Sequence, residues 1–568
     1  MADTKTQREK CEQRLSSMQA VRQPYEQDWQ EIFQLTLPAR GLVQMRQQNT
    51  GSVNANRRAN MASRDSRGGR AARTLTNGMQ AGLNSQALPW FKLTTSDRDL
   101  MEYEPVKVWL AEVERSIYEL FAGTNFYDAS KTGYAELGTI GIEACVMLEH
   151  PQYRAVCHSL TAGEYWIATD DGLRVDTLYR KSFLTTTQMV RSFPWDRLSL
   201  HVQDAYDKGN YQTLFPVIHA IEPRRERDPD RLDNANKPWQ SVCWEEGSTD
   251  KTKLLRVSGY DSKPFWAPRW ETTSNEVYSS SSPGFYAMPD LREMQLTARN
   301  RGRSRDLMVK PPIKAPIGMA GNKLRLDPGS VTFGSALDLD KVAPMFELGF
   351  QTLGAIRDEH EAVRRDVDEC FFVDLFMAIS QMEGVQPRND LELTLRENEK
   401  YTQLGPVVDR VNVEKLEVAI DRAFTILQSL NQIPPAPPEL QGRPLTVEFV
   451  SMLAQAQKAA QNTAIERAAR FVGFVAGLFP DAGIKFDAEQ AIDEFATGTG
   501  TPPRIIRSDE VVAKMKEDMQ QQMQQQQALE AAPAARDAAS AAELLSRTNV
   551  GGDTSLLQQV MGTTGGGV

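Results

Sequence analysis

Residues 289–326 read PDLREMQLTARNRGRSRDLMVKPPIKAPIGMAGNKLRL, and this stretch decides the predicted fold. It opens with a proline at a position that a helix start tolerates, and we predict a helix from Pro289 to about Val309. Prolines and glycines then interrupt the chain as far as Gly329 and flank short strand-like pieces. Helical signals resume from Asp340 to about Met382. The predicted order is therefore helix, small β insertion, helix.

Basic residues are concentrated in this same stretch, although the chain as a whole is acidic. Between Asp290 and Arg325 there are nine Lys or Arg and three Asp or Glu, a local charge of +6. The full chain has 65 Lys or Arg and 75 Asp or Glu, a formal charge of -10. Proteins that bind nucleic acid through their overall electrostatic field carry a strongly positive net charge, which this chain lacks. Any contact with DNA must therefore be local.

The basic residues of the first helix are distributed around its axis. At about 100° per residue, Arg292, Arg299 and Arg303 lie on one face. Arg301 and Arg305 lie on the opposite face, so the helix is polar nearly all round. Such a helix is either a solvated surface or one stabilised by neighbouring chains, and the charge alone favours the solvated surface over DNA contact.

Helical spacing recurs over much of the remaining chain, whereas one long region favours strands. From about Cys145 to Trp270, short β-branched and aromatic runs alternate with turn signals, which predicts a strand-rich lobe with a few helices. The polar segment Asn49–Arg70 predicts an exposed loop or arm. Gly302 weakens the basic helix, so an end near Asn300 is the alternative to the end at about Val309. The other predicted helices are Glu12–Leu35, Ala71–Leu83, Val106–Phe121, Val413–Leu430, Thr446–Leu478, Ala488–Phe495 and Ser508 to about Ser546.

Length and composition exclude several classes of protein. A chain of 568 residues is expected to form several lobes. No stretch approaches the roughly 18 uninterrupted apolar residues of a membrane helix, and the charged N-terminus lacks the apolar core of a secretory signal. We therefore expect a soluble protein made in a cytoplasm. The five cysteines are scattered without a C-x-x-C pair, which predicts free, mostly buried thiols.

The short motifs of common enzymes are absent from the sequence. There is no P-loop, nucleophile elbow, H-E-x-x-H helix or G-x-G-x-x-G loop. The group of residues most like a metal site surrounds His360. On a helix, however, His360 would share its face with Arg364, at the position where zinc-binding helices place a second ligand. We predict a solvated, ion-paired helical face there instead. The sequence predicts no catalytic, cofactor-binding or metal site.

Short markers of packing and turns follow one another along the chain. Each one alone is weak, because tryptophan, proline and glycine mark packing and turns in any fold. The markers are Trp29–Ile32 with Pro38, Asp65–Gly68, Leu83–Leu93, Val108–Leu110, Thr124–Tyr127, Leu137–Gly141, Gly163-Glu164, Val175-Asp176, Tyr179-Arg180, Pro264–Trp270, Pro283–Leu291, Pro311-Pro312, Leu326–Gly329, Leu404–Val407 with Arg410, and Gly500–Pro503.

In their order, from about Trp29 to Glu510, these markers resemble the portal family of short-tailed bacteriophages. The resemblance implies an α+β, mainly helical portal fold, assembled as a dodecameric ring at one capsid vertex. The implied lobes are an N-terminal wing (1–288), a stem helix (289–309), a clip (310–338), a second stem helix (339–372), a wing and tunnel-loop region (373–445), a crown (446–505), a C-terminal helical barrel (506–548) and a disordered tail (549–568).

The resemblance also implies a structural role in the virion rather than catalysis. The ring would be the channel for genome packaging and ejection at the head–tail junction, assembled in the host bacterial cytoplasm. The implied partners are further copies of the chain, the terminase large subunit, tail adaptor and tail tube proteins, major capsid and scaffolding proteins, and double-stranded DNA without sequence specificity, but no membrane.

The basic segment supplies the candidate site residues for such a ring. The candidates for the DNA channel or the stem are Arg292, Arg299, Arg301, Arg303 and Arg305, and those for the clip are Lys310, Lys314, Lys323 and Arg325. Two other functions remain open, namely a capsid scaffold or internal virion protein, and a DNA-processing enzyme whose site has no short motif.

Overall fold

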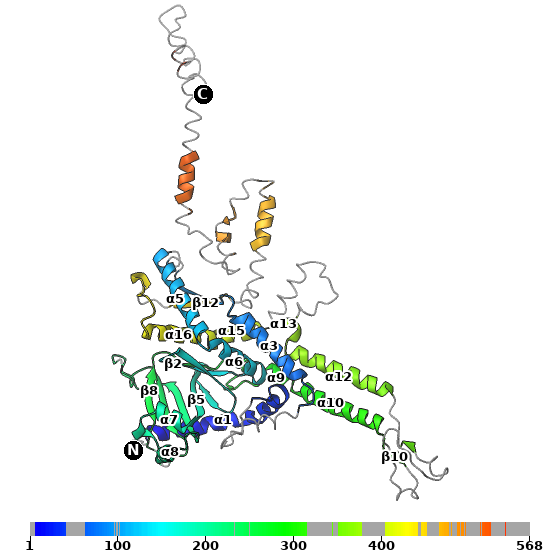
Figure 1. The fold of residues 1–568 in the computed structure, drawn as a ribbon. Coiled ribbons are helices and arrows are strands. Elements are labelled where there is room, and N and C mark those ends of the chain that lie inside the picture. Colours follow the sequence, from blue (N-terminus) through cyan, green and yellow to red (C-terminus); the bar gives the residue numbers. More distant parts are fainter. Residues whose placement is uncertain are drawn as a thin grey trace, which may run out of the picture.

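The computed structural model describes the chain in several stretches, and Figure 1 labels their elements. No helix in these stretches is long and apolar enough to cross a membrane. All five cysteines are described and free, and four of them are buried, as predicted. The described residues are 6–40, 63–314 (except 96, 98–99, 101–102, 232, 249 and 251), 343–344, 350–377, 404–440, 445–450 and parts of 465–543.

The largest hydrophobic core lies among helices of the main body. Trp90 stacks on Phe121 and Phe126, with ring centroids 5.9 and 6.3 Å apart. The predicted helices 71–83, 106–121 and 413–430 all contribute to this core. The helices of the body in this core are α3 (Arg67–Leu83), α5 (Glu104–Gly123), α6 (Phe126–Ile140), α13 (Val373–Met377), α15 (Gly405–Val411) and α16 (Glu417–Ser429), with a π-helical turn at Asn412–Leu416 and a 3-10 turn at Pro438–Leu440.

A five-stranded antiparallel sheet occupies much of the predicted strand-rich region, and each strand pairs with its neighbour in sequence. One face packs against the N-terminal half of α1 (Gln7–Thr36), where Cys11 and Leu15 meet Tyr179 and Trp244. Two short helices cover part of the other face. The strands are β4 (Tyr165–Thr169), β5 (Val175–Thr185), β6 (Leu214–Pro223), β7 (Trp239–Glu245) and β8 (Arg256–Tyr260), and the covering helices are α7 (Thr186–Ser192) and α8 (Leu200–Asp207), joined through a 3-10 turn at Trp195–Arg197.

Two smaller antiparallel sheets tie distant parts of the chain together. The first has the order β3-β2-β9, formed by Arg154–Leu160, Ala144–His150 and Phe265–Trp266. In the second, β1 (Phe91–Thr95) pairs with β12 (Leu445–Phe449). The predicted helix from Thr446 is therefore wrong at its start. Leu445–Phe449 alternates apolar and polar residues with the period of a strand, and its partner strand lies far away in the sequence.

A buried ion pair connects the helical core to the smaller sheet β3-β2-β9. Lys415 Nζ lies 2.8 Å from Glu143 Oε2, and neither side chain is appreciably exposed. The same ammonium lies 3.5 Å from the centroid of the Tyr134 ring. Trp266 donates to the other oxygen of Glu143 at 3.1 Å. Each buried charge is therefore matched, as burial in an apolar interior requires.

Two long helices project from the body as a pair (Figure 1). The short α9 (Pro283–Tyr286) precedes α10 (Met288–Val309), which leads outward to β10 (Ile313–Lys314). β10 pairs with β11 (Ala343–Pro344), and α12 (Phe350–Cys370) returns to the body. The predicted order of helix, β insertion and helix is confirmed, while residues 315–342 lie outside the described part.

The predicted helix end at about Val309 is confirmed and the alternative end near Asn300 is wrong, because α10 continues through Gly302 to Val309. Replacing Gly302 with alanine is expected to stabilise the protein by about 0.5–1 kcal/mol, since alanine restricts the unfolded chain and favours the helix. A Cβ at this position would meet no atom within 4 Å. Thermal unfolding and hydrogen exchange of the α10 amides measure the effect.

Gly78 offers the opposite case as a control. A Cβ at Gly78 would lie 2.1 Å from the Phe376 ring, so the same change there should destabilise the protein. A Gly302→Ala protein that melts at or below the wild-type temperature would contradict the prediction.

Candidate functional site

A buried polar network fixes the base of the projecting pair. His360 of α12 is fully buried, and its Nε2 lies 2.8 Å from Asp65 Oδ2. Arg364, one turn further along α12, donates from Nη2 to the same oxygen at 2.8 Å. Burial raises the pKa of Asp65, but hydrogen bonds from the Arg67 amide, Arg364 and His360 outweigh it and lower that pKa. Asp65 is therefore a carboxylate that holds two side chains of α12.

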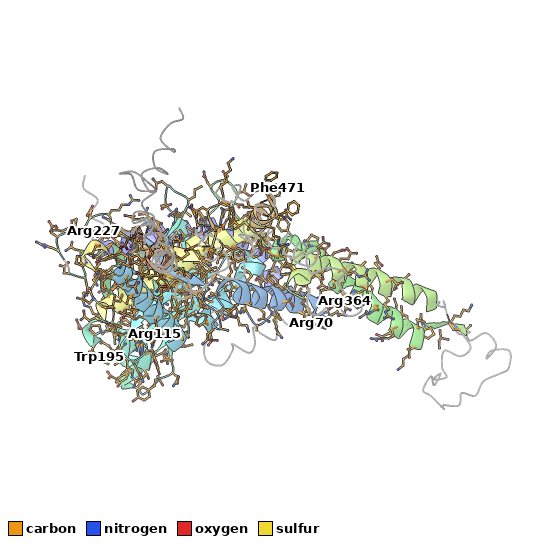
Figure 2. All side chains as sticks on the ribbon, turned by 90° about the horizontal axis from the view of Figure 1, so that it is seen from above. Arg70, Arg115, Trp195, Arg227, Arg364 and Phe471 are labelled. Carbon is orange, nitrogen blue, oxygen red and sulfur yellow. The ribbon has the colours of Figure 1, made fainter. Side chains whose placement is uncertain are left out.

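Two further contacts attach both helices of the pair to the start of α3. Arg67 donates to both carboxylate oxygens of Asp368, with 2.7 Å between Nε and Oδ1. Gln295 of α10 accepts from the Asp65 amide at 3.1 Å and donates to the Asp65 carbonyl at 2.9 Å. Figure 2 shows Arg364 at the body end of the pair. The residues around Asp65 thus form a common anchor for α10 and α12.

The structure corrects two predictions at this anchor. The end of the predicted exposed arm Asn49–Arg70 is anchored to the body, because Asp65 is buried and Arg67–Arg70 begin α3, although Arg64, Ser66 and Arg70 are exposed. The helical face around His360 is ion-paired through Arg364, as predicted, but His360 itself is buried and not solvated. The sequence around His360 gave no sign of its partner Asp65, which lies 295 positions away. Among the described residues, no three His, Cys, Asp or Glu side chains are grouped so that they could hold a metal ion.

The predicted basic residues of α10 differ in their surroundings. Arg292 forms an ion pair with Glu31 of α1, with distances of 2.5 Å from Nε and 2.7 Å from Nη2 to the two carboxylate oxygens. This contact ties α10 to the body, and it is the reason that the pKa of Glu31 is lowered. The other four arginines make no hydrogen bond or ion pair within the described chain; they are Arg299, Arg301, Arg303 and Arg305.

One side of α10 packs against α12, and the opposite side is exposed. Leu291 and Met294 are buried, and the half-buried Arg301 continues their side of the helix, where α12 packs. The exposed Arg299 and Arg303 lie on the opposite side, which we call the outward face. The five candidate arginines therefore do not converge on one site in the single chain.

Two open depressions mark the surface of this helix pair. One, of about 560 Å³, is lined by residues of both helices, including Arg292, Leu296, Ile356 and Glu359. The other, of about 620 Å³, lies near the tip and includes Arg303, Leu307, Val309 and Lys310 in its lining. The side chains of Leu296 and Val309 are 55% and 72% exposed. Both apolar side chains are therefore open to solvent on the projecting helix.

The two helices carry opposite charge. Between Met288 and Val309 there are five Arg against three Asp or Glu, a balance of 5 - 3 = +2. Between Phe350 and Cys370 there are three Arg against six Asp or Glu, a balance of 3 - 6 = -3. Glu359 and Asp366 are exposed members of the acidic set. A copy of this pair thus presents a basic helix and an acidic helix to any identical neighbour.

The predicted clip residues are only partly described. Lys310 and Lys314 are exposed at the tip of the pair, where Lys310 lines the larger depression. Lys323 and Arg325 lie outside the described residues.

Comparisons with known proteins agree with one another. The family model described as bacteriophage head to tail connecting protein matches residues 8–506. The portal protein of Salmonella phage epsilon15 is 34% identical over 561 residues, covering 99% of this chain and 99% of that protein. The probable portal protein of Bordetella phage BPP-1 is 37% identical over 523 residues, covering 91% of this chain and 92% of that protein.

A solved structure described as the virion of a native gene transfer agent particle aligns with 76% of this chain and 99% of its own chain. Its identity is 10% and the TM-score is 0.30, too low to compare the two folds element by element. The sequence matches cover nearly the whole chain, and they establish the family to which it belongs. The chain belongs to the family of bacteriophage head-to-tail connecting, or portal, proteins.

Proposed function

We propose that copies of this chain form a dodecameric portal ring at one vertex of a phage capsid, around a channel for genome packaging and ejection. The chain is a structural member of a family of portal proteins and not an enzyme. Membership in that family therefore sets aside the alternative of a DNA-processing enzyme. The observation that best supports a ring is the projecting pair, whose apolar and basic outward surfaces no described part of the same chain covers.

In this proposal α10 and α12 form the stem, residues 310–338 the clip, and residues 1–288 most of the wing. Residues 373–445 add the tunnel-loop region, residues 446–505 the crown and residues 506–548 the C-terminal barrel. The clip would dock the terminase large subunit and later the tail adaptor and tail tube proteins. The wing would meet the major capsid and scaffolding proteins.

The charge of the two stem helices favours contacts between neighbouring stems. Arg299 and Arg303 lie on the outward face of α10, whereas Glu359 and Asp366 are exposed on α12. We propose that these arginines of one copy meet those carboxylates of the next. Because every side chain repeats around a ring, a few such pairs per copy become a continuous belt of contacts. The acidic remainder of the chain limits tight phosphate binding, so DNA can slide without being trapped.

Electron microscopy of the purified full-length protein tests the proposal. A ring with an axial hole is the expected result. Closed shells would favour a capsid scaffold or internal virion protein instead, and a population of monomers under all assembly conditions would count against any ring.

A further inference from the structure

A row of basic side chains crosses the five-stranded sheet, far from the stem. The register pairs Arg180 of β5 with His219 of β6, His219 with Cys243 of β7, and Cys243 with Arg256 of β8. Residues paired across an antiparallel sheet point to the same face, so these four share one face. It is the face opposite α1, since Tyr179, the neighbour of Arg180 along β5, packs with α1. We call Arg180, His219 and Arg256 the basic row.

The guanidinium groups of Arg180 and Arg256 both lie over the strands between β5 and β8. Arg180 donates from Nε to His219 Nδ1 at 3.1 Å, so its guanidinium lies over β6. Arg256 places Nη2 3.8 Å from Cys243 Sγ, so its guanidinium lies over β7. Because adjacent strands are only about 4.8 Å apart, one small ligand can reach both guanidinium groups.

Hydrogen bonds define which donors of the row remain open. His219 accepts from Arg180 through Nδ1, and its Nε2 lies 2.8 Å from Ser241 Oγ, which makes it a neutral imidazole that donates to the serine. The two Nη groups of Arg180 make no hydrogen bond within the described chain. Arg256 is exposed and its one hydrogen bond there is the weak contact with sulfur. The open donors are therefore those of two guanidinium groups.

No carboxylate of the described chain lies within ion-pair distance of either arginine. Glu164 is the carboxylate whose pKa Arg180 affects: Arg180 lowers this pKa, while the stronger effect of burial raises it. Glu164 Oε2, however, accepts a hydrogen bond from the Thr161 amide and not from Arg180. Burial lowers the pKa of His219 far below its usual range, and Arg180, Arg256 and His158 lower it further. The row therefore has a positive potential that this part of the chain leaves uncompensated.

The neighbouring residues of the second sheet and of α16 add no unpaired positive charge to the row. His158 of β3 is within electrostatic range of Arg180, and burial together with Arg180 lowers its pKa to about 4. Arg422 of α16 lies 5.2 Å from the centroid of the Tyr260 ring, but Glu149 neutralises it at 3.0 Å. The unpaired positive charge is thus confined to Arg180 and Arg256.

We propose that Arg180 and Arg256 together bind a small oxyanion of the phosphate class. The ligand would accept N–H bonds from both guanidinium groups, which match tetrahedral oxyanions in geometry and charge. It would link β5 to β8 across the sheet and thereby stabilise this lobe. The site is separate from the stem and does not depend on ring formation.

Titration of the full-length protein with inorganic phosphate, at constant ionic strength maintained with chloride, tests this proposal. Calorimetry is expected to show one site per chain. Arg180→Gln and Arg256→Gln should each weaken phosphate binding about ten- to a hundredfold, since each removes charge-assisted hydrogen bonds. Arg227→Gln should leave the affinity unchanged, because Arg227, labelled in Figure 2, is exposed in the loop between β6 and β7 and does not belong to the row.

Circular dichroism establishes that each variant is folded. Arg256 is exposed, so Arg256→Gln remains informative even if Arg180→Gln does not fold. Phosphate binding that is absent from the wild-type protein, or equally strong in the Arg256→Gln and Arg227→Gln proteins, would overturn the proposal.

Discussion

Replacing Asp65 with alanine is expected to destabilise the base of the projecting helix pair by about 2–4 kcal/mol, because it leaves buried partners without their carboxylate. His360 is fully buried and loses its contact with Asp65, while the partly exposed Arg364 loses two hydrogen bonds. Since these side chains are one turn apart on α12, the helix should detach locally before the body unfolds. Hydrogen exchange should show faster opening of the α12 amides, and thermal unfolding a lower midpoint.

Asp358 provides a matched control on the same helix. Its side chain is exposed, so Asp358→Ala should change stability by less than about 0.5 kcal/mol. Equal effects of Asp65→Ala and Asp358→Ala would show that the network around Asp65 does not hold α12 to the body.

The pH dependence of stability should also reveal the contact between Asp65 and α12. The pKa of Asp65 is lowered in the folded protein, so its carboxylate contributes stability above the ordinary pKa of an aspartate, and this contribution is lost as the pH falls through the lowered value. The stability difference between wild type and Asp65→Ala should therefore be full at neutral pH and shrink below about pH 4. A difference that stays constant into strong acid would contradict this origin.

The sequence predicted the local elements well because their signals are local. Apolar spacing placed α1, α3 and α5 within a few residues, and prolines and glycines separated α10 from α12. The alternative helix end near Asn300, which rested on Gly302, was wrong because helix propensity is a weak preference that the surrounding structure overrides. The charges of α10 were likewise placed on the correct faces by helical geometry alone.

The contacts that organise the candidate site could not be predicted in the same way. Asp65 lies in a polar, Arg-rich segment, and no periodicity indicates that it binds His360 and Arg364 of α12. β12 was predicted as a helix because its partner β1 is more than 350 positions away, so no local pattern reports the pairing. Arg292 was a candidate for the DNA channel or the stem, and nothing in the sequence indicated that Glu31 of α1 is its partner. Long-range pairing of single side chains leaves no trace in composition or spacing.

Reversing the charge of Arg299 and Arg303 together is expected to prevent ring formation. In the proposed ring, the two substitutions place glutamates opposite the acidic residues of a neighbouring copy of α12, and like-charge contacts of this kind cost several kcal/mol at an interface. Assembled rings, counted by electron microscopy or measured by sedimentation, should fall to less than about a tenth of the wild-type yield. Arg225→Glu with Arg227→Glu, on an exposed loop of the body, is the control and should assemble normally.

Reversing the partner residues separates the two possible roles of this face. If Arg299 and Arg303 contact the next stem, adding Glu359→Arg and Asp366→Arg to the reversed protein restores opposite charges across the interface, and rings should return. If the two arginines line the channel instead, the reversed protein should form rings but package less DNA, and the added changes should not help. Replacing Arg292, Arg299 and Arg303 with glutamine while both rings and packaging stay at wild-type levels would exclude both roles, because a face that serves neither the neighbour nor the channel has no function in the ring.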